Sequence, residues 1–266
     1  MKLKYKTNYT TNEKEQITSI GPVSSGCDVE IPNNITKIKD YNFFSCPNLE
    51  KVELPDSIKL IGERAFEDCE ALRELILPKF IKTINFGAFH ACFNLKEVNI
   101  PDSLTTLDDE AFSICASLEK IKLSNNLTCI GHDIFYKCTA LKEVNIPSSI
   151  IDMYYNAFFG CNLLESIEIP ESVKFIDSRL FIDCENLKEI TIRAKCEIPK
   201  NITWDCSKLK KIYVTQESYD LSPNFVSTYR NKIEIIKPKT LDELLNEGKS
   251  FREINKIINN QENIIF

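Results

Sequence analysis

A cysteine recurs every 23 residues through most of the chain, at Cys46, Cys69, Cys92, Cys115, Cys138, Cys161 and Cys184. A phenylalanine lies three residues before each of these cysteines, and a leucine lies three residues after it. A unit of this size cannot bury its apolar face alone, but neighbouring units can bury one another's. The spacing therefore predicts a stack of similar coils rather than a globule.

Each unit contains the signal for one short strand. In one unit Leu95, Val98 and Ile100 are apolar with polar residues between the last two, which is typical of a half-buried strand. Pro101 follows and ends the strand because proline cannot donate to the ladder. The short polar side chain of Ser103 favours a turn.

The rest of the unit predicts an extended crossing, a tight turn and a helical turn. Ala65, Phe66 and Cys69 have helical spacing, which is enough for about one helical turn. We expect a left-handed residue at the position seven before each cysteine, because most residues found there tolerate positive φ. These residues are Gly62, Asn85, Asp108, Gly131, Tyr154 and Asp177.

This pattern resembles the 23-residue leucine-rich repeats of the BspA-like, or treponemal, type over residues 29–214. The resemblance implies a leucine-rich-repeat solenoid with parallel β-strands on the concave side and short helical turns opposite. It also implies roles in adhesion, recognition or scaffolding, and it carries over no catalytic residues.

Four regions follow along the chain. Residues 1–28 fit the repeat poorly and are interpreted as an N-terminal cap, and residues 29–214 form about eight coils. Residues 215–238 have the aromatic and apolar content of a C-terminal cap, which a solenoid needs to cover its open end.

Residues 239–266 predict an amphipathic helical tail, because Thr240 and Ser250 each begin a capping box and Gly248 separates the two. The tail could pack on the solenoid end or pair with another subunit. Its candidate interface residues are Leu241, Leu244, Leu245, Phe251, Ile254, Ile257 and Ile258.

Charge and composition exclude several partners. The formal net charge is −6 with Lys and Arg spread throughout, so we expect no binding to nucleic acid or anionic membrane. No segment has the roughly 20 apolar residues of a membrane span. Eleven cysteines without a signal-peptide pattern predict reduced thiols and a cytoplasmic protein. A cell-surface location reached by a route without a signal peptide is the alternative.

No motif predicts catalysis, a cofactor or a metal. The cysteines lack the close pairs of zinc sites, and His90 and His132 occupy different repeat positions. There is no phosphate-binding loop, dinucleotide fingerprint or nucleophile elbow. We expect a protein that is not an enzyme.

The expected concave face carries two outward rows of charged residues. If equivalent side chains stack, the opposite charges can neutralise one another as a ladder of exposed salt bridges, each contributing about 0–1 kcal/mol. We favour this interpretation over a mixed-charge docking face. The candidate residues of such a docking face are Arg73, Glu74, Ile76, Lys96, Glu97, Asn99, Glu119, Lys120, Lys122, Lys142, Glu143 and Asn145.

Large apolar or aromatic residues also occur in turns where polar ones would suffice, mostly two residues before a cysteine. Such a row is either partly buried packing or a lateral or convex interface. Its members are Phe44, His90, Phe93, Ile114, Tyr136, Tyr155, Phe159 and Ile182.

Together these features predict a non-catalytic protein–protein interaction scaffold that associates with itself. The alternative is a structural homo-oligomer or a surface adhesion protein whose main contact is with itself, a host protein or a neighbouring protein.

Overall fold

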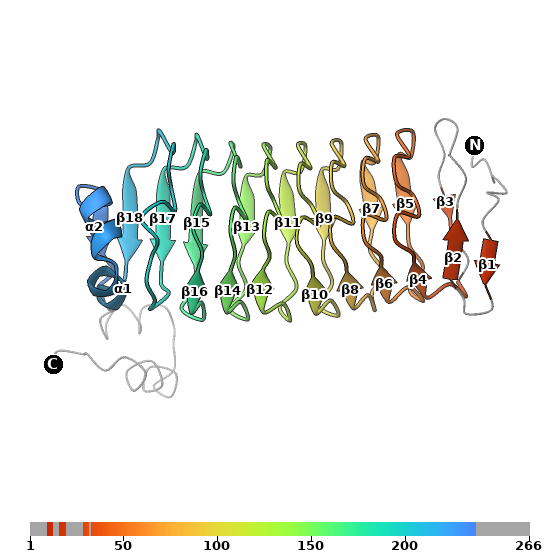
Figure 1. The fold of residues 1–266 in the computed structure, drawn as a ribbon, viewed down its shortest axis with the longest axis horizontal. Coiled ribbons are helices and arrows are strands. Elements are labelled where there is room, and N and C mark those ends of the chain that lie inside the picture. Colours follow the sequence, from red (N-terminus) through yellow and green to blue (C-terminus); the bar gives the residue numbers. More distant parts are fainter. Residues whose placement is uncertain (1–9, 13–15, 20–28, 32, 238–266) are drawn as a thin grey trace, which may run out of the picture.

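The computed structural model describes residues 10–12, 16–19, 29–31 and 33–237, and they form an elongated stack of coils (Figure 1). The strand β1 (Thr10–Asn12) lies at one end and the helix α2 (Pro223–Tyr229) at the other. The predicted solenoid is thus confirmed. The candidate tail at residues 239–266 lies outside the described residues.

The predicted strands form one side of the stack, which we call the first strand row. They form three successive sheets, and within each sheet they pair in parallel and in register, so that Lys120 lies between Glu97 and Glu143. Equivalent positions of successive repeats therefore lie side by side. The row consists of β3 (Val29–Glu30), β5 (Lys51–Glu53), β7 (Glu74–Ile76), β9 (Glu97–Asn99), β11 (Lys120–Lys122), β13 (Glu143–Asn145), β15 (Ser166–Ile169), β17 (Glu189–Ile192) and β18 (Lys211–Val214).

The segment predicted to cross the coil in extended form is itself a paired strand. An extended segment repeated in register places its N–H and C=O groups opposite those of the next coil, and both are satisfied by pairing. The resulting second strand row consists of β2 (Gln16–Ser19), β4 (Lys37–Ile38), β6 (Leu60–Ile61), β8 (Thr83–Ile84), β10 (Thr106–Leu107), β12 (Cys129–Ile130), β14 (Asp152–Met153) and β16 (Phe175–Ile176). At its end, β1 pairs antiparallel with β2.

The repeated phenylalanines form a continuous ladder in the core. All seven are fully buried. The ring of Phe112 lies 5.4 Å from that of Phe89 and 6.4 Å from that of Phe135, measured between centroids. The ladder therefore joins each coil to the next through its largest side chains.

The repeated cysteines are buried beside this ladder, and each satisfies a polar group. The thiol of Cys138 donates to the carbonyl oxygen of Phe112 in the preceding coil at 3.1 Å, and Cys69 donates to Phe43 at 3.2 Å. The ten cysteines in the described part of the chain are all free. A small apolar residue without the thiol would leave these carbonyl groups without that partner.

The third side of each coil, between a second-row strand and the next cysteine, consists of turns. Positive φ occurs five residues and one residue before the cysteine, for example at Arg64 (50°) and Asp68 (58°). The predicted left-handed position, seven residues before the cysteine, is wrong. Between the two left-handed residues, the N–H of Glu67 donates to the Arg64 carbonyl at 3.2 Å. Left-handed residues interrupt a helix, so the segment consists of hydrogen-bonded turns instead of a continuous helical turn.

Two glycines at the mispredicted position serve close packing between coils. A Cβ on Gly62 would lie 2.5 Å from the backbone nitrogen of Asp40 and 2.6 Å from the carbonyl carbon of Lys39. The approach lets the Asp40 carboxylate accept the N–H of Glu63 at 2.9 Å. A Cβ on Gly131 would lie 2.6 Å from the Asp109 carboxylate oxygen that accepts the His132 N–H, and 3.5 Å from the Asp109 backbone. These glycines allow a close approach and are not needed for backbone φ.

The C-terminal end is covered by α1 (Gln216–Leu221), α2 and the short strand β19 (Ile233–Ile235). Phe225 and Tyr229 on α2 are buried. The hydroxyl of Ser218 accepts the N–H of Cys196 at 3.1 Å, and that of Ser222 accepts the N–H of Ile198 at 2.8 Å. Serine hydroxyls thus accept the backbone N–H groups that would otherwise pair with carbonyl groups of a next coil.

Candidate interaction surface

The candidate concave-face residues all lie on the outer side of the first strand row. We call this surface, formed by residues 50–53, 73–76, 96–99, 119–122, 142–145, 165–168, 188–191 and 210–213, the strand face. All twelve candidates are exposed except Glu119, which is half-buried. The strand face carries nine Lys or Arg and nine Asp or Glu, so its formal charge is zero.

Charges on the strand face pair between neighbouring coils, along each row. Lys142 Nζ lies 2.7 Å from Glu119 Oε2, and Lys188 Nζ lies 2.8 Å from Glu165 Oε2. The hydrogen bond from Lys142 lowers the pKa of the Glu119 carboxyl, and its charge adds to the effect. The strand face is therefore largely neutralised internally, which leaves little charge for a partner.

The candidate lateral patch is only partly at the surface. Phe44 is 44% exposed and Phe93 is 37% exposed. Ile182 is buried, so its prediction as a surface residue is wrong. The equivalent position, two residues before the cysteine, is also buried at Glu67 and Ser113. A residue at this position, beside a left-handed turn residue, lies at the edge of the core. The remaining candidates are half-buried: His90, Ile114, Tyr136, Tyr155 and Phe159.

Two members of this patch form a stacked aromatic pair. The rings of Tyr136 and Phe159 lie 4.9 Å apart with an interplanar angle of 26°. Lys137 Nζ lies 5.4 Å from the centre of the Tyr136 ring. Half-buried stacked rings present a firm apolar surface at little cost in side-chain entropy.

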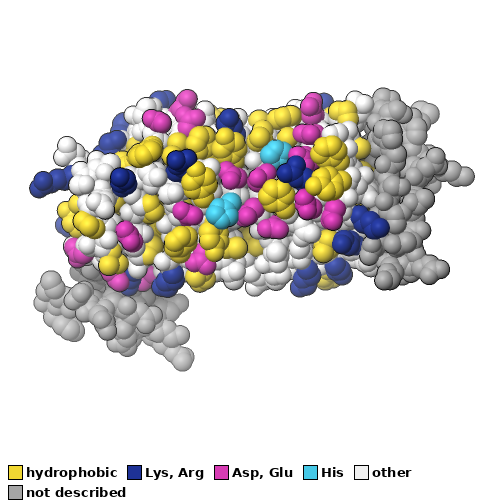
Figure 2. Space-filling model, in the orientation of Figure 1, with side chains coloured by type: hydrophobic (Ala, Val, Ile, Leu, Met, Phe, Trp, Pro, Cys, Tyr) yellow, Lys and Arg dark blue, Asp and Glu magenta, His cyan; other side chains and the backbone are white. Residues whose placement is uncertain are grey.

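The turns make up a distinct surface, which we call the turn face: residues 39–45, 62–68, 85–91, 108–114, 131–137, 154–160 and 177–183. It contains ten Asp or Glu and four Lys or Arg, a formal charge of −6 that equals the net charge of the whole chain. Figure 2 shows this side, with both histidines of the chain in view among aromatic and acidic side chains. Negative charge is thus concentrated on one side of the solenoid.

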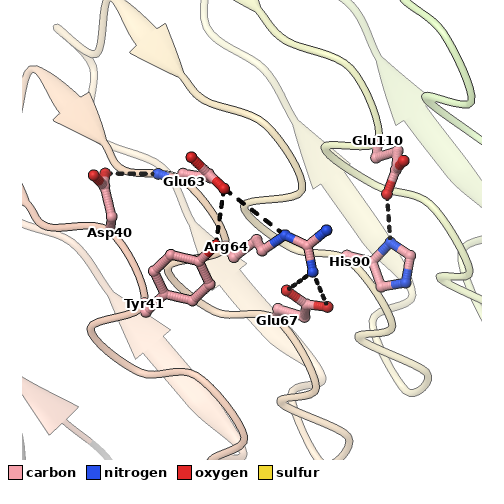
Figure 3. A network of polar contacts seen from close by, with 7 residues as sticks. All are labelled: Asp40, Tyr41, Glu63, Arg64, Glu67, His90 and Glu110. Atoms are coloured by element: carbon pink, nitrogen blue, oxygen red, sulfur yellow. Dashed lines mark hydrogen bonds and ion pairs between the residues drawn. The ribbon is translucent and has the colours of Figure 1, made fainter.

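At one end of the turn face a cation is held by a complete set of partners (Figure 3). Arg64 Nη1 donates to both carboxylate oxygens of Glu67 at 3.0 Å. The Arg64 guanidinium also lies 5.1 Å from the centre of the Phe86 ring. The Tyr41 hydroxyl donates to Glu63 at 2.9 Å, and this hydrogen bond raises the pKa of Tyr41. We call Arg64, Glu67 and Phe86 the Arg64 clamp.

Sequence reasoning missed a second aromatic group, where the turn face meets the second strand row. The His132 and Tyr154 rings lie 5.0 Å apart, and the Tyr154 and Phe175 rings lie 5.9 Å apart. Phe175 is 46% exposed. The three occupy different repeat positions, so a search along single columns could not find them. Aligning neighbouring columns of adjacent repeats would have brought them together.

Two further findings concern the described ranges alone. They contain no group of three or more His, Cys, Asp or Glu side chains placed to hold a metal ion. In these same ranges no helix has the length and apolar character needed to cross a membrane.

A stack of 23-residue coils with in-register parallel strands and a buried leucine position defines a leucine-rich-repeat solenoid. The chain belongs to the family described as BspA type leucine rich repeat region, which it matches in six copies over residues 10–119 and 105–232. Proteins of this class are interaction scaffolds in general.

Solved structures show the same fold. A leucine-rich cell surface protein from Faecalibacterium prausnitzii is 24% identical with a TM-score of 0.65, and the match covers 80% of this chain and 69% of that one. A leucine-rich repeat protein from T. pallidum is 28% identical with a TM-score of 0.60, covering 68% of this chain and 87% of that one. Among curated proteins, no sequence matches significantly.

Proposed function

We propose that this protein is a non-catalytic protein-interaction scaffold that uses the turn face as its main binding surface. The supporting observation is the contrast between two sides of one solenoid. The strand face has balanced charges that pair along its rows, whereas the turn face has a formal charge of −6 together with accessible aromatic rings. Accessible aromatic side chains and unbalanced charge are what a partner can recognise.

The proposal includes self-association through the apolar part of the turn face. Phe44, Tyr136 and Phe159 present ring surface there; Phe44 is 44% exposed and packs edge-on against the Tyr41 ring at 5.9 Å. The tail at residues 239–266 is a second proposed contact, on the strength of its amphipathic sequence. The strand face is retained as an alternative docking surface, and the experiment distinguishes the two.

Sedimentation of the purified protein at tens of micromolar tests the proposal. The wild type should have a mass above the monomer mass of 30.6 kDa. Tyr136→Asp with Phe159→Asp should shift it to monomer, and so should removal of residues 239–266. Reversing two charges on the strand face, with Lys96→Glu and Lys142→Glu, should leave the assembly intact. Circular dichroism of each variant provides the control for folding.

A monomeric wild type at that concentration would overturn self-association. If only the strand-face variant becomes monomeric, the self-association surface is the strand face and not the turn face.

The location is also a proposal. Ten free cysteines favour a reducing compartment, and we propose the cytoplasm. The similar protein from F. prausnitzii is described as a cell surface protein, which supports surface adhesion as the second candidate function. Fractionation of the source cells followed by immunodetection separates the two: surface labelling of intact cells would overturn the cytoplasmic assignment.

A further inference from the structure

Four carboxylates lie along the border of the turn face and the second strand row. Asp108 and Asp109 belong to one coil, Asp152 belongs to the second coil after it, and Asp177 belongs to the third. Asp152 pairs in register with Cys129 on one side and Phe175 on the other. We call Asp108, Asp109, Asp152 and Asp177 the acidic ledge.

No cation neutralises the acidic ledge within the described ranges. In these ranges none of its four carboxylates forms an ion pair, at 4.0 Å or less, with a Lys, Arg or His nitrogen. The cations Lys137 and Arg179 on these coils lie over the rings of Tyr136 and Tyr155 instead.

The hydroxyl of Tyr154 experiences this negative field. Its pKa is raised mainly by the charge of Asp152, followed by burial and by Cys129, Asp109 and Asp177. Three of the four carboxylates, Asp152, Asp109 and Asp177, therefore act on the same hydroxyl.

The acidic ledge adjoins the second aromatic group, whose neighbouring rings are tilted against each other. We call this group, formed by His132, Tyr154 and Phe175, the aromatic stack. Asp152 is next to Phe175 in the paired strands and two residues before Tyr154, so carboxylate and ring surfaces occur together. Asp109 is fixed because its Oδ1 accepts the His132 N–H at 2.7 Å, and Asp177 is fixed because its Oδ1 accepts the Ser178 N–H at 2.6 Å. The site is therefore organised before any partner arrives, which reduces the entropy lost on binding.

The Arg64 clamp shows which group completes such a set. There a guanidinium lies over Phe86 and donates both bonds to the Glu67 carboxylate. Arg64 occupies the position five residues before its cysteine, and the corresponding residues of the later coils are Glu110, Asp133, Asn156 and Arg179. Arg179 lies over the Tyr155 ring and donates to its hydroxyl, and it forms no ion pair with the acidic ledge within the described ranges.

We propose that the acidic ledge and the aromatic stack bind an arginine side chain from a basic segment of a partner protein. A guanidinium can lie on the Tyr154 and Phe175 rings while donating to Asp152 and Asp177, and it is less strongly hydrated than a lysine ammonium. This inference rests on the proposed function, since it names the partner chemistry of the turn face.

The test is fluorescence anisotropy of the full-length protein with a labelled Gly/Ser peptide that carries spaced arginines. A peptide of the same length with lysines measures the preference for guanidinium. Asp152→Asn with Asp177→Asn removes two ledge charges and keeps an acceptor oxygen at each position. Glu97→Gln with Glu189→Gln is the matched control, because it removes two exposed carboxylates from the strand face.

We expect the ledge variant to weaken binding of the arginine peptide about tenfold or more, and the control variant to change it less than about twofold. Phe175→Leu should weaken it about two- to fivefold and reduce the preference for arginine over lysine. Equal weakening by the ledge and control variants would overturn the proposal, since binding would then follow net charge alone. Equal affinity for the arginine and lysine peptides would overturn it as well.

The two proposals fail separately. Absence of peptide binding by a wild type that still self-associates would remove the acidic ledge as an arginine site and leave the scaffold function in place. If the wild type does not bind the peptide and the ledge variant no longer self-associates, the proposal of a separate partner protein is overturned. The ledge then binds a second copy of the chain. If the wild type is monomeric and binds the peptide, the arginine site on the ledge is supported and only the proposal of self-association is contradicted.

Discussion

The substitution Phe112→Ala should strongly destabilise the solenoid. Phe112 is fully buried in the middle of the phenylalanine ladder. Truncation of a core phenylalanine to alanine costs about 3–5 kcal/mol through lost burial and the cavity left behind. Ring contacts with Phe89 and Phe135 contribute about 0.5–1.5 kcal/mol each in addition to burial.

The flanking coils cannot close on this cavity. Their separation is fixed by backbone hydrogen bonds, such as those from Phe112 N–H to the Ile134 carbonyl at 3.2 Å and from Phe89 N–H to the Ala111 carbonyl at 2.9 Å. We therefore expect a loss of about 4–5 kcal/mol, in the upper half of the range for such changes. Typical domains have a total unfolding free energy of about 5–15 kcal/mol, so this variant should lose about a quarter of its stability or more.

Equilibrium urea unfolding followed by circular dichroism and by intrinsic fluorescence measures the change. Two probes are needed because stacked repeats can unfold in parts. Phe44→Ala is the matched control, since that ring is 44% exposed, and it should cost less than about 1 kcal/mol. A loss below about 1 kcal/mol for Phe112→Ala, equal to that of the control, would refute the continuous core.

Two other predictions concern buried thiols and close-packed glycines. Burial raises the pKa of the Cys115 thiol from 9.0 to about 12. The stability it contributes is complete below pH 9 and is lost as pH rises toward 12, so the urea midpoint should fall in that window, and less in Cys115→Val. Half-buried Cys129 should react with a thiol reagent before the other described cysteines, and earlier labelling of Cys115 would contradict this. Gly62→Ala should cost about 1–3 kcal/mol, and more than Gly131→Ala, because its Cβ would lie 2.5 Å from a backbone nitrogen whereas that of Gly131 would meet one Asp109 carboxylate oxygen at 2.6 Å, with the Asp109 backbone at 3.5 Å. Equal unfolding free energies for the two alanine variants would show that the coils are less closely packed.

The sequence by itself determined the architecture. The recurring Phe, Cys and Leu could be assigned to one interior because a fixed period places each copy in the same environment. Local alternation around Val98 and Ile100, followed by Pro101, was enough to locate the first-row strand β9.

The sequence could not show the second strand row or the turn geometry. A two-residue strand such as β12 has no periodicity to detect, and it exists because the next coil supplies its hydrogen-bond partners. The sequence predicted positive φ at Gly62, which is wrong: glycine is required there by the backbone of Asp40, which comes close only after the coils stack.

The tertiary structure alone decided which surface is distinctive. Net charge is a property of the sequence, but the stacking of coils determined that the charges of the strand face balance to zero and pair between coils, while the turn face has a formal charge of −6. Asp152 and Phe175 are 23 residues apart in the chain and lie side by side on neighbouring coils. Their association depends on inter-coil register, which is set by backbone pairing across the stack rather than by any local sequence preference.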